Sequence, residues 1–140
     1  MEESVLSVWD NASSGKDGRL QLIQYLSSHR STVTSTAMTW LGSSRVMLSV
    51  GKDRQLSFWR LRDDRKYESL AVFPKAHSRV IWDCCAVFDH SVKVKTEESE
   101  GEGEGEEMAI FATASRDGLV RLFGVAANGN VMVGDANIIG

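Results

Sequence analysis

Residues 47–60 read MLSVGKDRQLSFWR, and residues 111–124 read FATASRDGLVRLFG. Each stretch starts with small or apolar residues, continues through a basic residue followed by aspartate, and ends in an alternating run that carries an aromatic residue. Asp53 precedes Trp59 by six positions, and Asp117 precedes Phe123 by the same six. A pattern that occurs twice with equal internal spacing indicates a structural repeat.

Short stretches of alternating apolar and polar residues occur along the whole chain, whereas helical periodicity is nearly absent. They are rich in Val, Ile, Leu, Thr and aromatic residues, and Gly, Ser, Asp or Asn separate them. This pattern is typical of an antiparallel all-β protein. It predicts strands at residues 5–9, 19–26, 33–40, 45–50, 55–61, 67–73, 80–88, 108–114 and 119–125.

The repeat has a measurable period. His29 and His77 are 48 positions apart, Trp9 and Trp59 are 50 apart, and Trp59 and Phe123 are 64 apart. The larger last interval matches an inserted stretch, whose removal returns the spacing to the mid-forties. A period of about 40 to 45 residues with four strands predicts β-propeller blades. The predicted parts are the end of a preceding blade at 4–26, a blade at 29–73, a blade at 77–125 with an insertion at 89–107, and a tail or start of a next strand at 126–140.

The insertion contains an acidic run. Seven of the 19 acidic residues lie in EESEGEGEGEE at 97–107, and without them 12 acidic residues face 16 basic ones, although the whole chain has a net charge of −3. Alternating Glu and Gly offers no apolar face, so we expect a disordered loop. The run is either solvated surface or a docking site that binds a basic partner or competes for a basic groove.

Length and composition exclude several classes of protein. A chain of 140 residues holds one domain or less. No run approaches the about 18 apolar residues of a membrane span, and the N-terminal MEESVLSVWD lacks the order of a signal peptide. We therefore expect an intracellular protein, cytoplasmic and also nuclear, with no membrane contact. Cys84 and Cys85 are adjacent, so a strand would direct them to opposite faces as two reduced thiols, one buried and one exposed.

A histidine near a hydroxyl and an aspartate suggests a catalytic triad, and the chain offers two such sets. The repetition argues against catalysis, because a nucleophilic site needs one cleft and one oxyanion hole. The sequence contains no G-x-S-x-G, no Gly-rich phosphate loop and no paired metal ligands. We expect no enzyme activity, no catalytic residues, no metal and no cofactor.

The two sets resemble WD40 repeats, in which a His, a Ser or Thr, an Asp and a Trp form a buried hydrogen-bonded chain. The resemblance implies that Asp binds His and that the hydroxyl links His to the indole N–H. The first blade supplies His29, Ser49, Asp53 and Trp59, and the second supplies His77, Thr113 and Asp117. Both histidines are expected in the link before the first strand. Phe123 has no N–H donor, so we expect the second blade to be the less rigid.

A closer resemblance involves KAHSRVIWDC at 75–84, followed by FATASRDGLVRLF. Together with the preceding SSHRSTVTSTAMTWLGSSRVMLSVGKDRQLSFWR at 27–60, it is similar to the C-terminal propeller of the Elongator subunit 2 family. The similarity covers about residues 20–125. It implies a non-catalytic scaffold that binds the large scaffold subunit and the catalytic subunit of the complex that modifies wobble uridines in tRNA. That subunit carries two propellers, whereas this chain holds only about two complete blades, so it is expected to be a fragment of an incomplete propeller.

Open blade faces and basic loops are the expected contact surfaces. Two blades leave two apolar faces uncovered, so we expect association with itself or with the missing blades. Among the basic residues, Arg79 is the first candidate for partner binding, because Arg is enriched at interface hot spots. The other candidates are Arg54 and Arg116 in turns, and Arg60 and Arg62, which form a basic cluster with Arg65 and Lys66. Two alternatives stay open: direct contact of that cluster with RNA, which Asp63 and Asp64 weaken, and membership of another intracellular complex.

Overall fold

Strands make up the regular secondary structure of the described residues, as the alternating sequence predicts. The computed structural model describes residues 4–10, 20–95 and 105–134. The described part of the chain contains no helix long and apolar enough to cross a membrane. The strands are β1 (Ser4–Asp10), β2 (Gln21–His29), β3 (Val33–Leu41), β4 (Ser44–Gly51), β5 (Leu56–Leu61), β6 (Tyr67–Phe73), β7 (Ile81–Ala86), β8 (Val92–Val94), β9 (Glu106–Ser115), β10 (Val120–Ala126) and β11 (Val131–Gly134).

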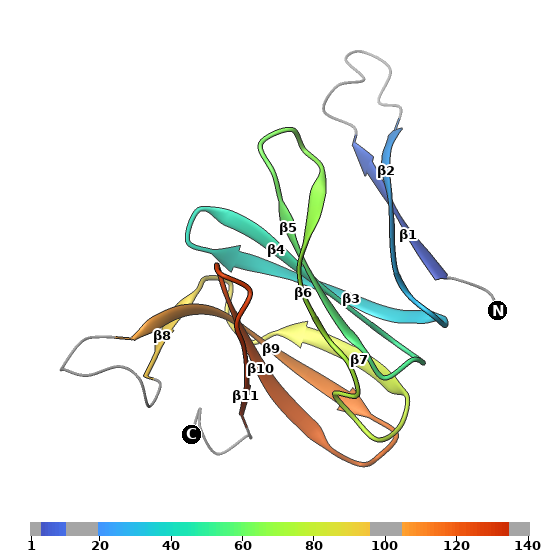
Figure 1. The fold of residues 1–140 in the computed structure, drawn as a ribbon, viewed down its shortest axis with the longest axis vertical. Coiled ribbons are helices and arrows are strands. Elements are labelled where there is room, and N and C mark those ends of the chain that lie inside the picture. Colours follow the sequence, from blue (N-terminus) through green and yellow to red (C-terminus); the bar gives the residue numbers. More distant parts are fainter. Residues whose placement is uncertain (1–3, 11–19, 96–104, 135–140) are drawn as a thin grey trace.

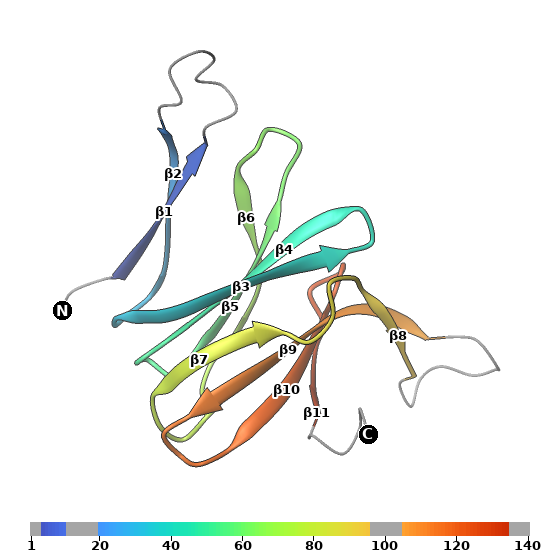
Figure 2. The same ribbon diagram turned by 180° about the vertical axis from the view of Figure 1, so that it is seen from behind.

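These strands form antiparallel sheets that follow one another along the chain (Figure 1). β1 and β2 form a hairpin, and β3, β4, β5 and β6 form a four-stranded meander in chain order. The third sheet has the order β11-β10-β9-β7, and β8 also pairs with β9. The first strands of the two larger sheets, β3 and β7, contact each other. Figures 1 and 2 show the two larger sheets stacked, with the β1–β2 hairpin on the far side of the β3–β6 sheet.

The central pairs of the two larger sheets share one register. Met47 of β4 pairs with Trp59 of β5, and Phe111 of β9 pairs with Phe123 of β10. The members of the second pair each lie 64 positions after those of the first. A slip of one residue would exchange the two faces of a strand, so the matching register places corresponding residues of both sheets on corresponding faces.

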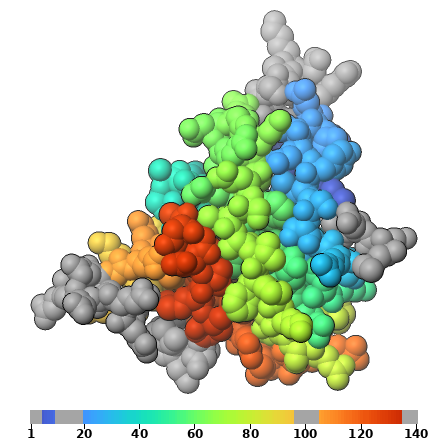
Figure 3. Space-filling model, in the orientation of Figure 1, coloured from blue at the N-terminus to red at the C-terminus, as the bar shows by residue number. Residues whose placement is uncertain are grey.

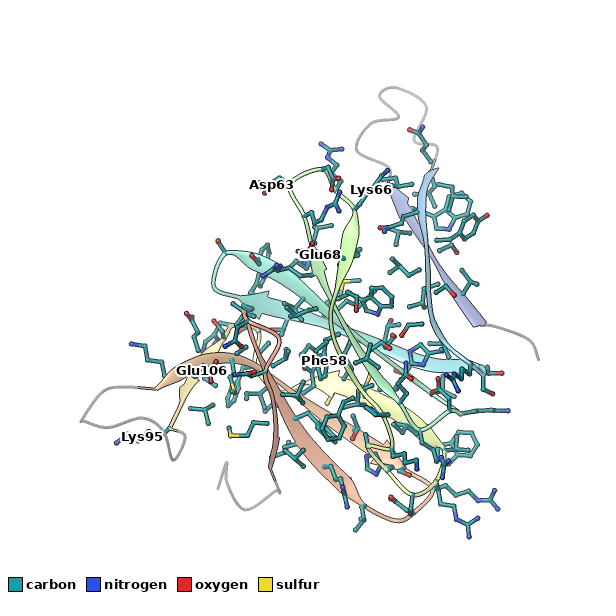
Figure 4. All side chains as sticks on the ribbon, in the orientation of Figure 1. Phe58, Asp63, Lys66, Glu68, Lys95 and Glu106 are labelled. Carbon is teal, nitrogen blue, oxygen red and sulfur yellow. The ribbon has the colours of Figure 1, made fainter. Side chains whose placement is uncertain are left out.

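The main core lies between the two larger sheets. Phe58 of β5 is fully buried, and its ring centroid lies 6.0 Å from that of Phe111 on β9 (Figure 4). Burial of side chains of this size stabilises the fold by about 1.5–3 kcal/mol each. Alternate residues of both sheets complete the core, among them Val46, Leu48, Val50, Leu56, Ile81, Ala109, Phe123 and Val125.

The opposite face of the β3–β6 sheet receives the β1–β2 hairpin. Leu26 of β2 is buried against Met47, Trp59 and Tyr67. The side-chain amide of Gln24 donates to the carbonyl of Tyr67 at 2.8 Å, and its oxygen accepts from the Tyr67 N–H at 2.7 Å. The β3–β6 sheet is therefore packed on both of its faces.

One strand lies in residues 126–140, for which the sequence predicts either a tail or the start of a next strand. Asn128 and Gly129 form the turn between β10 and β11, and an Asn-Gly pair is a strong hairpin signal. Gly129 has a φ of +89°, and a Cβ there would lie 2.8 Å from the carbonyl oxygen of Leu70. Glycine is thus required both by the turn and by the close approach to β6. Figure 3 shows the red C-terminal segment beside the green segment that includes β6.

The expectation of a disordered insertion at 89–107 is wrong at its two ends. Val92, Lys93 and Val94 form β8, which pairs with Met108, Glu107 and Glu106 of β9. Val92 and Val94 also pack near Met108 and Ile110, so apolar burial holds this short pair together. Residues 96–104 of the insertion lie outside the described residues.

Candidate functional site

The first candidate site is a chain of hydrogen bonds that joins four segments. The Asp53 carboxylate lies 2.9 and 3.1 Å from Nδ1 of His29, so Nδ1–H is the donor. The Oγ of Ser49 lies 2.8 Å from Nε2 of the same imidazole, and it accepts from the Trp59 indole N–H at 3.0 Å. In the neutral imidazole, Nε2 accepts the Ser49 hydroxyl proton. The structure therefore brings together all four residues that the sequence analysis selected.

His29 lies in a strand and not in a link between strands, which differs from the expectation. It is the last residue of β2, whereas the sequence analysis placed it in a link before a first strand. The reason is that Ser4 of β1 pairs with His29 and extends the hairpin to this point. The imidazole therefore crosses from the hairpin to the β4–β5 turn and connects two sheets.

The second candidate site repeats the first on the next sheet. Nδ1 of His77 lies 3.0 Å from Asp117, and Nε2 lies 2.6 Å from Oγ1 of Thr113. His77 lies in the link between β6 and β7, as expected. Phe123 occupies the position that corresponds to Trp59, and its ring lies edge-on to the imidazole with centroids 6.3 Å apart. The second chain of hydrogen bonds therefore ends at the threonine.

Each aspartate also holds the backbone of its turn. Asp117 accepts from the N–H groups of Leu119 at 2.9 Å and Ser78 at 3.3 Å. Desolvation by burial opposes ionisation of Asp117, but hydrogen bonds from Leu119, His77 and Ser78 outweigh it and lower the pKa to about 2. Asp53 likewise accepts backbone N–H groups, from Arg30 at 3.0 Å and Gln55 at 3.2 Å.

Burial determines what these networks can do chemically. The side chains of Ser49 and Thr113 are 0% and 1% exposed, and His29 and His77 are both 2% exposed. An attacking hydroxyl needs access to a substrate carbonyl, and both hydroxyls are enclosed between strands. The hydrogen bonds of each network instead connect a turn to the neighbouring strands, and each polar group has a partner. Among the described residues, no buried side-chain N or O atom is without a hydrogen-bond partner.

The cysteines and acidic residues offer no metal centre in the described part of the chain. No group of three or more His, Cys, Asp or Glu side chains there could hold a metal ion. Cys84 is buried and Cys85 is exposed, as their adjacent positions in a strand predict. Burial raises the pKa of the Cys84 thiol to about 11, so it stays protonated near neutral pH.

Three of the five candidate arginines for partner binding gather at one end of the molecule. Arg54 lies in the β4–β5 turn, and its carbonyl accepts from Ala76 in the β6–β7 link at 2.9 Å. Arg116 lies in the β9–β10 turn, and its N–H donates to the carbonyl of Val80 at 3.0 Å. Arg79 precedes Val80 in that same link. All three arginine side chains are exposed.

The other two candidate arginines lie at the opposite ends of the strands and are paired with acids. Arg60 contacts Glu68 at 2.7 Å and donates to the carbonyl of Ala127 at 3.2 Å. Arg62 forms an ion pair with Asp64. Figure 4 shows Asp63 and Lys66 together at the tip of the β5–β6 hairpin. This basic cluster is therefore interleaved with compensating negative charge.

A second surface is an open apolar sheet face, which was expected from the sequence although its residues were not selected. The free face of the β7–β11 sheet contains a hollow of about 490 Å³, lined mainly by apolar side chains that include Phe88, Val92, Ile110, Leu122 and Met132. The alternation of 120–126 contained the signal, because Leu122 alternates with Phe123 and must face away from the main core.

The chain matches no model of a known protein family, and it matches no curated protein.

Proposed function

We propose that this chain forms consecutive blades of a WD40-type β-propeller and serves as a non-catalytic protein-interaction scaffold, as subunit 2 of Elongator does. The observation that carries the proposal is the recurrence of one buried network. Asp53–His29–Ser49 and Asp117–His77–Thr113 occupy matching positions of two successive sheets. Two independent catalytic sites would not need the same buried geometry, whereas a repeated architecture does.

The uncovered sheet face supports further blades. Five residues of the β3–β6 sheet that face the main core are fully buried, namely Val46, Leu48, Val50, Leu56 and Phe58. The residues 64 positions later lie on the free face of the β7–β11 sheet, namely Ile110, Ala112, Ala114, Val120 and Leu122. Val120 there is 59% exposed, whereas its counterpart Leu56 is 0% exposed. This face corresponds to one that a neighbouring sheet covers, so it fits a further four-stranded sheet.

The contacts with other subunits would lie on the loops. Rigid sheets present their loops at fixed positions, and binding residues are concentrated on loops. Arg79, Arg54 and Arg116 are exposed on turns that backbone hydrogen bonds hold together. In the proposed role, these turns face the large scaffold or catalytic subunit of Elongator, and the chemistry on tRNA belongs to the catalytic subunit.

A pull-down with the large scaffold and catalytic subunits of Elongator tests this function. We expect capture that survives high salt, because apolar contacts add to the charged ones. Arg79→Ala should weaken capture by about 2 kcal/mol if Arg79 is a hot spot. Arg65→Ala, which removes an exposed arginine from the β5–β6 turn, is the matched control and should leave capture unchanged. Failure of the wild-type chain to bind either subunit would contradict membership of Elongator and favour another intracellular WD40 complex.

The alternative of RNA contact at Arg60 to Lys66 has weaker support. Phosphate binding needs several uncompensated cations on one face. Arg60 and Arg62 instead contact Glu68 and Asp64.

A further inference from the structure

The end of the molecule beside the two histidine networks carries a concentration of positive charge. We define the histidine end as residues 30–32, 52–55, 74–80 and 116–119, which connect β2 to β3, β4 to β5, β6 to β7 and β9 to β10. These turns lie at the lower right of Figure 1 and at the lower left of Figure 2. Six basic side chains are exposed there: Arg30, Lys52, Arg54, Lys75, Arg79 and Arg116.

Backbone hydrogen bonds hold these turns against one another. The N–H of Lys52 donates to Thr32 at 2.9 Å, and the N–H of Ala76 donates to Arg54 at 2.9 Å. Arg116 donates to Val80 at 3.0 Å, which joins the last turn to the β6–β7 link. The six basic residues therefore lie on four segments that are hydrogen-bonded to one another, so binding does not have to order the backbone that carries them.

The acidic residues of these four segments are directed inward. They are Asp53 and Asp117, whose carboxylates accept from His29 and His77 and from backbone N–H groups. Their side chains are only 9% and 7% exposed. The outer surface of the histidine end consequently presents cations, while the negative charges are used in the networks below it.

The opposite ends of the strands have a balanced charge. Among residues 42–43, 62–66, 87–95, 105–107 and 127–130, five are basic and five are acidic. Figure 4 shows this mixture at Asp63 and Lys66 on one hairpin and at Lys95 and Glu106 on the β8–β9 pair. Among the described segments at the two ends of the strands, the uncompensated charge thus lies at the histidine end.

We propose that the histidine end binds the phosphate backbone of a nucleic acid. The cations stand on four separate segments from successive sheets, which suits an extended polyanion that contacts several points. An acidic peptide would need apolar anchors in addition. The hollow of about 490 Å³ lies instead among Phe88, Val94 and Met132, away from the histidine-end residues. This inference is independent of the scaffold function.

The first test measures binding of the full chain to a fluorescent single-stranded RNA across a salt series. A strand that contacts all six cations gives a slope of log K against log salt of about −4, at about 0.7 per contact. Affinity should then fall more than a hundredfold between about 50 and about 200 mM salt. A DNA strand of the same sequence should bind similarly if phosphates alone are read, whereas a clear preference for RNA would assign additional contacts to the 2′-hydroxyls.

Charge-matched variants locate the site. The triple variant Arg54→Gln, Arg79→Gln, Arg116→Gln should reduce the slope by about 2 and weaken binding at least tenfold at low salt. The triple variant Arg62→Gln, Arg65→Gln, Lys66→Gln removes the same number of charges from the β5–β6 turn and should keep the wild-type slope. Replacement of the first three arginines by lysine should also retain most of the slope. Circular dichroism of each variant checks that the sheets are intact.

Three results would overturn the inference. Absence of RNA binding by the wild-type chain at low salt is the first. An equal loss of affinity in both glutamine triple variants is the second, because it would show a general charge effect. Binding of polyglutamate as tight as that of RNA is the third, since it would assign the surface to acidic proteins. The pull-down with Elongator subunits is a separate measurement on the wild-type chain, so the two proposals fail separately.

Discussion

The indole N–H of Trp59 donates to the hydroxyl of Ser49 at 3.0 Å, deep between the hairpin and the β3–β6 sheet. The corresponding pair on the next sheet is Phe123 and Thr113, where no such donor exists. The two networks thus differ at their fourth member, since only the first has a donor to its hydroxyl. That difference gives a direct way to measure what the fourth member of the network contributes.

Trp59→Phe should lower the free energy of unfolding by about 1 kcal/mol or somewhat more, because it removes the donor to Ser49 and some buried surface. Urea unfolding followed by circular dichroism measures the change. Trp82→Phe is the matched control, since Trp82 is 50% exposed on β7 and should change stability little. Equal effects of the two substitutions would contradict a role for the Trp59 hydrogen bond.

His77→Ala and His29→Ala should each lower the free energy of unfolding by about 1–3 kcal/mol, because each leaves a buried hydroxyl and a carboxylate without their partner. His90→Ala is the control, since His90 is exposed on the loop before β8. Urea unfolding applies again. If either buried substitution left stability unchanged and abolished partner binding, the networks would be binding sites and not structural elements.

Amide hydrogen exchange should be faster in the β9–β10 pair than in the β4–β5 pair. The network on β9 ends at Thr113, so that sheet has one fewer cross-link than the sheet with Trp59. Exchange followed by mass spectrometry can compare residues 48–50 with residues 112–114. Trp59→Phe should bring the first segment closer to the second. Slower exchange at 112–114 in the wild-type chain would contradict the expected order of rigidity.

Asp117 should stabilise the fold in a pH-dependent way. Its folded pKa of about 2 lies below the ordinary value of 3.8, so its contribution is present above about pH 4 and is lost as the pH falls toward 2. Asp117→Asn should therefore lower the melting temperature near neutral pH, and its difference from wild type should shrink as the pH decreases through this range. Asp63→Asn, in the exposed β5–β6 turn, serves as the control for a general charge effect. A difference for Asp117→Asn that grows on acidification would show that the sign is wrong.

The uncovered face of the β7–β11 sheet should drive self-association of the chain at micromolar concentration. Leu122→Glu would place a charge in the apolar hollow of that face and should shift the chain toward monomer. Sedimentation velocity distinguishes the species. Lys95→Glu, at the edge of the same hollow, changes charge without removing apolar surface and should have the smaller effect. A wild-type chain that sediments as a single monomer would refute the prediction.

The members of both histidine networks could be selected from sequence because their spacing repeats. Strand positions followed from alternation, and the nine predicted strands match β1 to β7, β9 and β10 apart from shifts at their ends. β8 was missed because three residues are too few for a periodic signal, and its pairing with β9 and apolar contacts hold it. β11 lies in residues 126–140, where a tail and the start of a next strand were both left open although Asn128 and Gly129 marked its turn.

The sequence by itself determined the all-β class, the repeated turn with its aspartate, and the histidine and hydroxyl that belong to each turn. These features are local or periodic, so they can be read along one chain. Only the tertiary structure decided that Arg30, Lys52, Arg54, Lys75, Arg79 and Arg116 share one surface while Arg60 and Arg62 pair with acids elsewhere. That separation depends on hydrogen bonds between distant turns and on the stacking of sheets, and neither leaves a periodic trace in the sequence.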